Sequence, residues 1–221
     1  MIYNTDCIIG SQKYLADEGT DLIVTDPPYN LGFGGTTQTK TKRPRFSIIA
    51  NDNLSDQEYK RFSIMWLKEA YRVLKPGRHI YVFIDWRMYS LIFHLMKHVG
   101  FQIKNCIVWD KVNMGMGWQY RYRHEFIIFA VKGKSKVRRI GSRAATDILR
   151  VPRISGNKTI HPTEKPTDVI KPLVLNSSLE GEHIVDFFCG SGPVKEVADE
   201  TGRLFTGFEI DPEHYSNAIK R

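Results

Sequence analysis

The stretch of this sequence whose residue types could do chemistry is Asp26-Pro27-Pro28-Tyr29. Each proline fixes its own φ and lacks an N–H, and Pro28 drives Pro27 toward an extended conformation, so the carbonyl groups here point in fixed directions. The Asp26 carboxylate and a rigid carbonyl then offer two acceptors side by side. Together they could hold both hydrogens of an exocyclic amino group on a nucleobase and localise the nitrogen lone pair for attack.

Tyr29 adds a flat amphipathic ring, which could stack on a base turned out of its helix. The ordinary alternative is a turn, because Asp-Pro and Pro-Pro pairs are common turn chemistry and the tyrosine could simply pack in the core. The remaining chain has to decide between a site and a turn.

Alternating strands and helices must position this tetrapeptide. The apolar run 21–25 predicts a buried parallel strand that ends at Asp26, where ligands gather in open α/β sheets. A strand over 2–5 and a helix over 8–16 precede it as a βαβ unit with parallel strands. The sequence also predicts strands over 79–84, 101–109, 126–131, 183–188 and 204–208, and helices over 55–74, 87–98, 169–174 and 193–201. This alternation indicates an α/β fold.

Composition sets the limits of the interpretation. The 221 residues fit one domain, 1–221, and the net charge of +8 favours an acidic polymer as partner. Cys7, Cys106 and Cys189 are widely spaced without a CxxC, which predicts a reducing compartment and no metal site. No signal-like start or membrane-length apolar run is present, so we expect a cytoplasmic protein.

A second candidate site follows the strand over 183–188. Strand, glycine loop (Gly190-Ser191-Gly192) and helix form a nucleotide-type binding arrangement, because glycine lets the backbone approach a ligand closely. The full GxGxxG pattern is absent, so a dinucleotide is not expected. Glu209, after the next strand, could accept bonds from both ribose hydroxyls. A nucleoside with a cationic centre would suit the acidic residues Asp6, Asp26, Asp186 and Glu209.

Three segments are candidates for contact with nucleic acid. Residues 30–53 predict a long, mobile, glycine-hinged basic loop near the tetrapeptide, with an ordinary surface loop as the alternative. Residues 110–123 interleave glycine, aromatic and arginine residues, and could line a groove or form an exposed hairpin tip. Residues 132–160 are the most basic segment and predict a small insertion that meets a duplex, against a solvated basic face.

Three motifs together resemble a family. Asp26-Pro27-Pro28-Tyr29, the run from His161 to Pro166 (HPTEKP) and the run from Asp186 to Gly192 (DFFCGSG) are similar, in type and order, to the β group of DNA amino-methyltransferases. The resemblance implies a Rossmann-like, doubly wound, mostly parallel seven-stranded sheet in circularly permuted order. It also implies S-adenosylmethionine as cofactor, double-stranded DNA as substrate, and residues 132–160 as a short target-recognition region.

The resemblance further implies roles for individual residues. Asp26 and the Pro27 carbonyl, within the turn closed by Pro28, would hold the target amine while Tyr29 stacks on the flipped base. The cofactor's adenine would lie at Asp6 and the Cys7 backbone, and its ribose at Glu209. Its methionine part would lie near the loop residues Phe188, Gly190, Ser191 and Gly192, covered by Thr163 and Lys165, with Asp186 and Asp26 beside it.

The sequence also departs from the family's pattern. Phe187 stands where the family usually has proline, and Pro193-Val194 stands where a Thr-Thr pair is usual. Asp26 resembles the adenine-N6-specific version, whereas the cytosine-N4 version more often has serine. The alternatives are therefore a cytosine-N4 methyltransferase, a catalytically silent DNA-binding relative and, less favoured, an RNA methyltransferase. The short recognition region makes a homodimer a further hypothesis.

Overall fold

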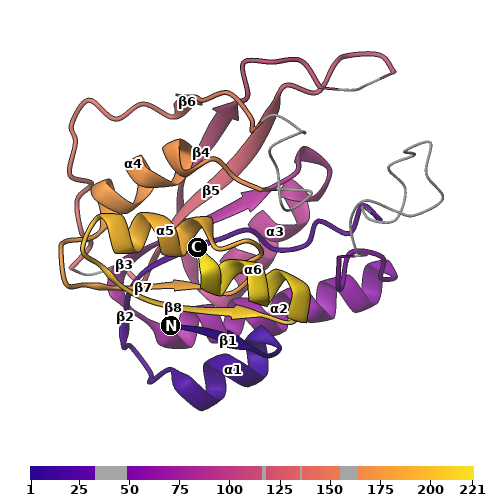
Figure 1. Cartoon of the computed structure of the whole chain (residues 1–221). Coiled ribbons are helices and arrows are strands. Elements are labelled where there is room, and N and C mark those ends of the chain that lie inside the picture. The colour runs from indigo at the N-terminus through magenta and orange to yellow at the C-terminus, as the bar shows by residue number, and fades with distance from the viewer. Residues whose placement is uncertain (33–48, 116–117, 135, 155–163) are drawn as a thin grey trace.

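The computed structural model describes residues 1–32, 49–115, 118–134, 136–154 and 164–221 of the chain. Within these ranges one sheet of eight strands carries six helices (Figure 1). The strands are β1 (Ile2–Asn4), β2 (Thr20–Thr25), β3 (Leu74–Ile84), β4 (Phe101–Asp110), β5 (His124–Lys132), β6 (Ile148–Arg150), β7 (His183–Asp186) and β8 (Leu204–Glu209). The helices are α1 (Cys7–Tyr14), α2 (Asp56–Val73), α3 (Trp86–Val99), α4 (Thr167–Ser177), α5 (Pro193–Glu200) and α6 (Pro212–Lys220).

The strand order is β1-β8-β7-β2-β3-β5-β4-β6, and β5 alone among the described strands runs against its neighbours. The predicted α/β class with a mostly parallel sheet is confirmed. The prediction of seven strands is wrong, because the three residues of β6 pair with the end of β4 inside the basic segment. So short an edge strand leaves no alternating pattern that a sequence could reveal.

Two further details differ from the sequence prediction. The two strands of the predicted βαβ unit, β1 and β2, are not neighbours in the sheet. Strand β1 pairs with β8, and β8 and β7 lie between β1 and β2. Strand β3 begins at Leu74, well before the predicted residue 79. Lys75-Pro76-Gly77 looked like a break between helix and strand, but it lies inside β3, where the register with β2 shifts between Thr20 and Leu22. A register shift is a place where a strand tolerates proline.

Helices cover both faces of the sheet (Figure 1). On one face α2 and α3 pack Trp66, Leu67 and Ile92 into one apolar cluster, and on the other α4 and α5 pack Val174 and Val197 into a second. The doubly wound arrangement is thus present, with β2 fully buried between the layers. None of the helices in the described ranges is long and apolar enough to cross a membrane.

Helix α6 was not predicted from the sequence, although its start carries a signal. Asp211 is the N-cap residue and accepts hydrogen bonds from the backbone N–H groups of Glu213 (2.8 Å) and His214 (3.0 Å), while Pro212 occupies the first turn. An Asp-Pro pair is a common helix start as well as a turn. The helix packs Ala218 against the glycine loop, so it helps to shape the site.

Candidate active site

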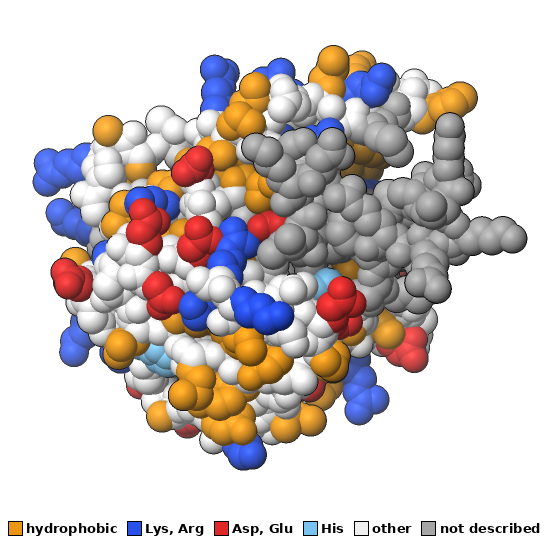
Figure 2. Space-filling model, in the orientation of Figure 1, with side chains coloured by type: hydrophobic (Ala, Val, Ile, Leu, Met, Phe, Trp, Pro, Cys, Tyr) orange, Lys and Arg blue, Asp and Glu red, His pale blue; other side chains and the backbone are white. Residues whose placement is uncertain are grey.

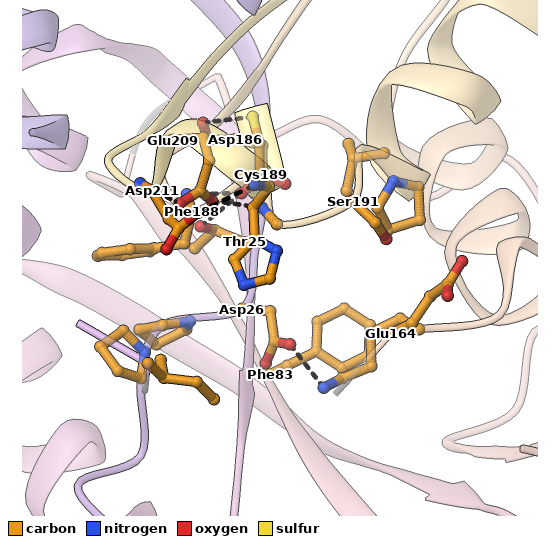
Figure 3. A pocket seen from close by; sticks show the side chains of 18 of the residues that line it. Thr25, Asp26, Phe83, Glu164, Asp186, Phe188, Cys189, Ser191, Glu209 and Asp211 are labelled. Atoms are coloured by element: carbon orange, nitrogen blue, oxygen red, sulfur yellow. Dashed lines mark hydrogen bonds and ion pairs between the residues drawn. The ribbon is translucent and has the colours of Figure 1, made fainter. Parts of the chain in front are cut away.

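The predicted tetrapeptide follows β2 at the edge of the sheet where the parallel strands end, and it opens onto a cleft shared with the ends of β7 and β8. The space within the cleft is about 960 Å³, counting the solvent at its mouth. Figure 3 shows Asp26 and Phe83 facing Glu209, Asp186 and Cys189, with Ser191 and Glu164 to one side. The structure therefore brings the catalytic prediction and the cofactor prediction together in one cleft.

The tetrapeptide is held by a hydrogen bond from helix α2 and by one between its own first and last side chains. The Tyr59 hydroxyl of α2, itself buried, donates to the Pro28 carbonyl at 2.8 Å. The Tyr29 hydroxyl donates to Oδ1 of Asp26 and lies 3.3 Å from Oε2 of Glu125. Tyr29 is 8% exposed and lines the cleft. Its stacking on a flipped base stays a prediction.

The other oxygen of Asp26, Oδ2, accepts a hydrogen bond from Nζ of Lys165 at 2.6 Å. Lys165 was predicted to cover the cofactor, but its side chain is 4% exposed and its ammonium also lies 3.2 Å from Glu125. Lys111 in turn pairs with the second oxygen of Glu125. Two carboxylates and two ammonium groups thus form a cluster around Tyr29, which we call the Asp26 cluster.

Burial and charge shift the pKa values in the Asp26 cluster in different directions. Burial raises the pKa of Asp26, and Glu125 adds to that shift while Lys165 opposes it. Burial also acts to raise the pKa of Glu125, but Lys165 and Lys111 outweigh it and the pKa is lowered. For Lys165, burial acts to lower the pKa, yet its two carboxylate neighbours raise it. Lys165 therefore stays charged against Asp26.

The glycine loop is tied to the sheet by two acidic side chains. Oδ1 of Asp186 accepts a hydrogen bond from the N–H of Phe188 (3.0 Å), and Oε2 of Glu209 accepts one from the N–H of Gly190 (2.8 Å). Burial raises the pKa of Asp186 to about 7 and that of Glu209 to about 7. Both carboxylates hold the loop that lines the cleft, and Glu209 faces into it.

Position 192 requires glycine, because its backbone conformation and its surroundings leave no room for a side chain. Its φ is 82°, and a Cβ there would lie 3.3 Å from the Cα of Ala218 in α6. A side chain would therefore be strained in conformation and in space. Ser191 beside it is buried, and its hydroxyl oxygen is 3.4 Å from Nη1 of Arg221. The chain thus turns tightly into α5, as the sequence predicted.

A smaller cavity of about 310 Å³ adjoins the main cleft. Both are lined by Ala50, Phe188, Glu209 and Ile210, and the smaller one also by Asp6, Cys7, Phe187 and Phe208. This brings the residues predicted for the cofactor's adenine next to the residue predicted for its ribose. Asp6 also caps α1 through the N–H groups of Ile8 (2.9 Å) and Ile9 (3.2 Å).

Phe187, a departure from the family's pattern, is 1% exposed. Its ring packs 6.3 Å from the ring of Trp66 and 6.0 Å from that of Phe208, measured between centroids. The extra ring is accommodated by the core and forms a wall of the smaller cavity. It leaves the glycine loop in place.

The two ends of the predicted loop 30–53 are joined to each other. The side chain of Asn30 accepts a bond from the Leu54 N–H (2.7 Å) and donates one to its carbonyl (2.9 Å), and the Gly32 N–H donates to the Asp52 carbonyl (2.7 Å). Ile49, Ala50 and Asp52 line the cleft. Residues 33–48 of that loop and Thr163, predicted at the cofactor, lie outside the described residues.

Only part of the basic segment 132–160 is available to a duplex. Lys132 belongs to β5 and is buried, with its ammonium 3.1 Å from Glu18, and Arg138 binds Glu182 and the Ser177 carbonyl. These two side chains are therefore engaged within the protein, and the role of the segment in recognising DNA stays a prediction. The described basic residues that remain exposed there are Lys134, Lys136, Arg139, Arg143, Arg150 and Arg153. On the face seen in Figure 2, Lys and Arg side chains are scattered rather than gathered in one patch.

Several functional candidates escaped the sequence reasoning. Glu125 directly precedes a predicted strand, but only the antiparallel direction of β5 brings its start to the edge where β2 ends. Tyr59 lies in a predicted helix, where nothing in the sequence marks its hydroxyl group as a contact of the turn. His214 and Glu164 also line the cleft. His214 stands in no pattern that marks it, and Glu164 lies within the HPTEKP run but was given no role.

Comparisons with known proteins decide the family. The family model described as DNA methylase matches residues 20–220. The chain belongs to this family. It is 30% identical, over 96% of its own length and 71% of the relative's, to the Type II methyltransferase M.HpaI of Haemophilus parainfluenzae. The protein is thus a DNA methyltransferase that uses S-adenosylmethionine, and DNA is its substrate.

Solved structures of methyltransferases share the fold. The crystal structure of an M1.HpyAVI–SAM complex aligns with a TM-score of 0.73 at 23% identity, over 100% of this chain and 98% of that one. The PvuII DNA methyltransferase, described as cytosine-N4-specific, aligns with a TM-score of 0.78 at 16% identity, over 99% and 84%. These similarities establish the fold of the DNA methylase chain. They do not identify the base that it methylates, which has to be argued from the residues of the site.

The residues of the two cavities suit S-adenosylmethionine. Glu209 presents a carboxylate where both cavities meet, as a ribose diol requires. Asp26, Asp186 and Asp211 also line the main cleft, and acidic walls attract a sulfonium cation. This fit rests on the chemistry of the lining side chains.

Proposed function

We propose that the methyl acceptor is the exocyclic N6 amine of adenine in duplex DNA, presented on a base that is turned out of the helix. The observation that carries the proposal is the position of Asp26, which lines the same cleft as Gly190, Ser191 and Glu209. The resemblance to the adenine-specific version of the motif supports adenine over cytosine.

In this proposal Asp26 and the Pro27 carbonyl accept the two amine hydrogens. Both oxygens of Asp26 already have a partner, Tyr29 on Oδ1 and Lys165 on Oδ2, but a carboxylate has about four lone-pair sites and can accept more. Bound S-adenosylmethionine supplies an electrophilic methyl group. When the amine nitrogen gains that methyl group it gives up one proton, and Asp26 is the base placed to take it.

The connection between β4 and β5 is the proposed contact with DNA. Its base adjoins the Asp26 cluster through Lys111 and Glu125. Trp118 is 96% exposed and Tyr120 is 93% exposed, which is unusual for such large rings, and the exposed Arg121 directly follows Tyr120 in the chain. Exposed rings and guanidinium groups beside a base-flipping site suit stacking on unpaired bases and contact with phosphates.

Transfer of a labelled methyl group to oligonucleotide duplexes tests the function. Duplexes of mixed sequence offer adenine and cytosine together, and digestion to nucleosides identifies the base that carries the label. We expect label in N6-methyladenine, and a fall of at least about 100-fold in Asp26→Asn, with cofactor binding retained.

Asp85→Asn is the matched control for that experiment. Asp85 directly follows the neighbouring strand β3 and caps α3, where asparagine caps equally well, so this variant should keep full activity. Label in N4-methylcytosine would show that the target base is cytosine and not adenine. Full activity of Asp26→Asn would overturn the proposed role of Asp26. Binding of DNA without transfer to any base would favour the silent alternative.

We also propose that the active form is a homodimer, because the recognition segment is short and several of its basic groups remain exposed on one copy. The mass of the protein in solution, measured with and without duplex DNA by light scattering, tests this. Two copies per complex are expected, and a monomer in both conditions would reject the proposal.

A further inference from the structure

Glu125 is the carboxylate of the Asp26 cluster that is not one of the described residues that line the main cleft. It lies at the start of β5. Its Oε2 lies 3.2 Å from Nζ of Lys165 and 3.3 Å from the Tyr29 hydroxyl, while Lys111 binds its Oε1. Glu125 therefore contacts both groups that hydrogen-bond to Asp26.

We propose that Glu125 is a positioning residue for methyl transfer, which fixes Lys165 and Tyr29 on Asp26 and keeps that carboxylate strong enough as a base to accept the amine proton. The inference rests on the proposed function, because it needs Asp26 to hold the target amine. It adds a residue that is in none of the three motifs.

The first argument is geometric. Lys165 has a long flexible side chain, yet only 4% of it is exposed, and its ammonium is shared between one oxygen of each carboxylate. Tyr29 is shared in the same way, with its hydroxyl on Asp26 and beside Glu125. Without Glu125, both partners of Asp26 would lose their second anchor. A catalytic group has to be held to well within an ångström of its working position.

The second argument is electrostatic. Asp26, Glu125, Lys111 and Lys165 together carry no net charge, which buried ions require. If the charge of Glu125 is removed, Lys165 interacts with Asp26 alone and stabilises its ionised form more strongly. Asp26 then becomes a weaker base for the amine proton. Glu125 thus balances the lysine that orients Asp26.

Other titratable groups also face Asp26, and they are the same in every variant compared below. Asp186 is close enough for its pKa to respond to Asp26. The remaining ones in the wall of the cleft are Asp52, Glu164, Glu209, Asp211 and His214. A difference between variants in the pH profile is therefore due to the changed side chain.

The test compares single-turnover rates of methyl transfer, at saturating S-adenosylmethionine, across pH for the full chain and for Glu125→Gln. Asp26 has to be ionised to accept the amine, so the rate falls on the acid side. We expect the rate at pH 8 to fall by about tenfold or more in Glu125→Gln. We call the fall in rate at low pH the acid limb of the profile. We expect this limb to move to lower pH in Glu125→Gln, on the order of one unit, because Asp26 loses a negatively charged neighbour. Lys165→Met should move the same limb to higher pH.

Glu69→Gln is the matched control. Glu69 is 13% exposed, against 14% for Glu125, and it pairs with Arg72 away from the cleft. It should lower stability to a similar extent and leave the acid limb unchanged. Glu125→Asp, which keeps the charge, should retain the wild-type limb even where its rate is lower.

Three results would overturn the inference: a wild-type rate in Glu125→Gln, an unshifted acid limb, or shifts of the same sign in Glu125→Gln and Lys165→Met. The Asp26→Asn variant separates this failure from failure of the proposed function. If Asp26→Asn is inactive while the Glu125→Gln limb stays in place, only the role of Glu125 is rejected. If Asp26→Asn is fully active, the proposed function itself fails.

Discussion

The Thr25 hydroxyl donates a 2.9 Å hydrogen bond to Oδ1 of Asp186, and it accepts one from the Phe187 N–H at 3.2 Å. Thr25 is the last residue of β2, directly before the Asp26 to Tyr29 turn, and Asp186 is the last residue of β7, directly before the glycine loop. The two strands are neighbours in the sheet. This buried link therefore fixes the turn that is proposed to hold the target amine relative to the loop that is proposed to hold the methyl donor.

Thr25→Val should lower the free energy of unfolding by about 1–3 kcal/mol, because it leaves a buried carboxyl and a buried N–H each without one partner. Urea denaturation measures the change. Thr20→Val is the matched control, since Thr20 is equally buried on β2 and its hydroxyl has no hydrogen-bond partner within the described part of the chain. That variant should be neutral or slightly stabilising. Equal losses in both variants would contradict the importance of the link.

The sequence supported much of the fold because its strands are buried on both faces and read as apolar runs that end at glycine, proline or acidic residues. The run 21–25 and the loop Gly190-Ser191-Gly192 were located by this signal. Strand order and direction carry no such signal. The place of β1 beside β8, and the reversed direction of β5, depend on contacts between residues far apart in the chain.

The candidate site shows the same division. Asp26 and Gly190 stand in recognisable motifs and Glu209 follows a predicted strand, and the structure brings all three into one cleft. Lys165 was predicted for the cofactor, and it lines the cleft, but its ammonium lies 2.6 Å from Oδ2 of Asp26, a contact that no motif indicates. Glu125 could not be found, since its importance comes from two charges that approach it only in the folded chain.

Binding of S-adenosylmethionine should depend on pH through Glu209, whose pKa burial raises to about 7. The ionised carboxylate accepts bonds from hydroxyl groups and attracts a cation, so binding favours the deprotonated form. Affinity should therefore rise from pH 6 to pH 8, by up to about tenfold per unit below the pKa and less above it. Calorimetric titration of the full chain across that range measures the change.

Glu209→Gln supplies the control for this pH dependence, since it cannot ionise and keeps one acceptor. Its affinity should be lower at pH 8 and should change less between pH 6 and pH 8 than that of the wild type. The difference between the two proteins isolates Glu209 from the cofactor's own titration and from Asp186. A parallel pH dependence in both would show that Glu209 does not contact the cofactor.

Tyr59→Phe should impair methyl transfer more than stability. The hydroxyl donates to the Pro28 carbonyl at 2.8 Å, and its loss should cost about 1 kcal/mol in the free energy of unfolding while freeing the catalytic turn to move. Tyr81→Phe is a matched control, because Tyr81 is similarly buried and its hydroxyl lies 2.7 Å from Ser177, away from the turn. We expect a similar stability loss in both and a several-fold lower single-turnover rate only in Tyr59→Phe.

Trp118→Ala should weaken binding of duplex DNA by about tenfold or more, because one exposed ring can contribute about 1–3 kcal/mol by stacking on a base. The salt dependence of binding should hardly change, since no charge is lost. Arg121→Ala should instead reduce the slope of affinity against salt by about one. Leu204→Ala, another strongly exposed apolar residue but at the start of β8 on the opposite edge, should bind as the wild type does. Unchanged DNA affinity in Trp118→Ala would place the duplex elsewhere on the enzyme.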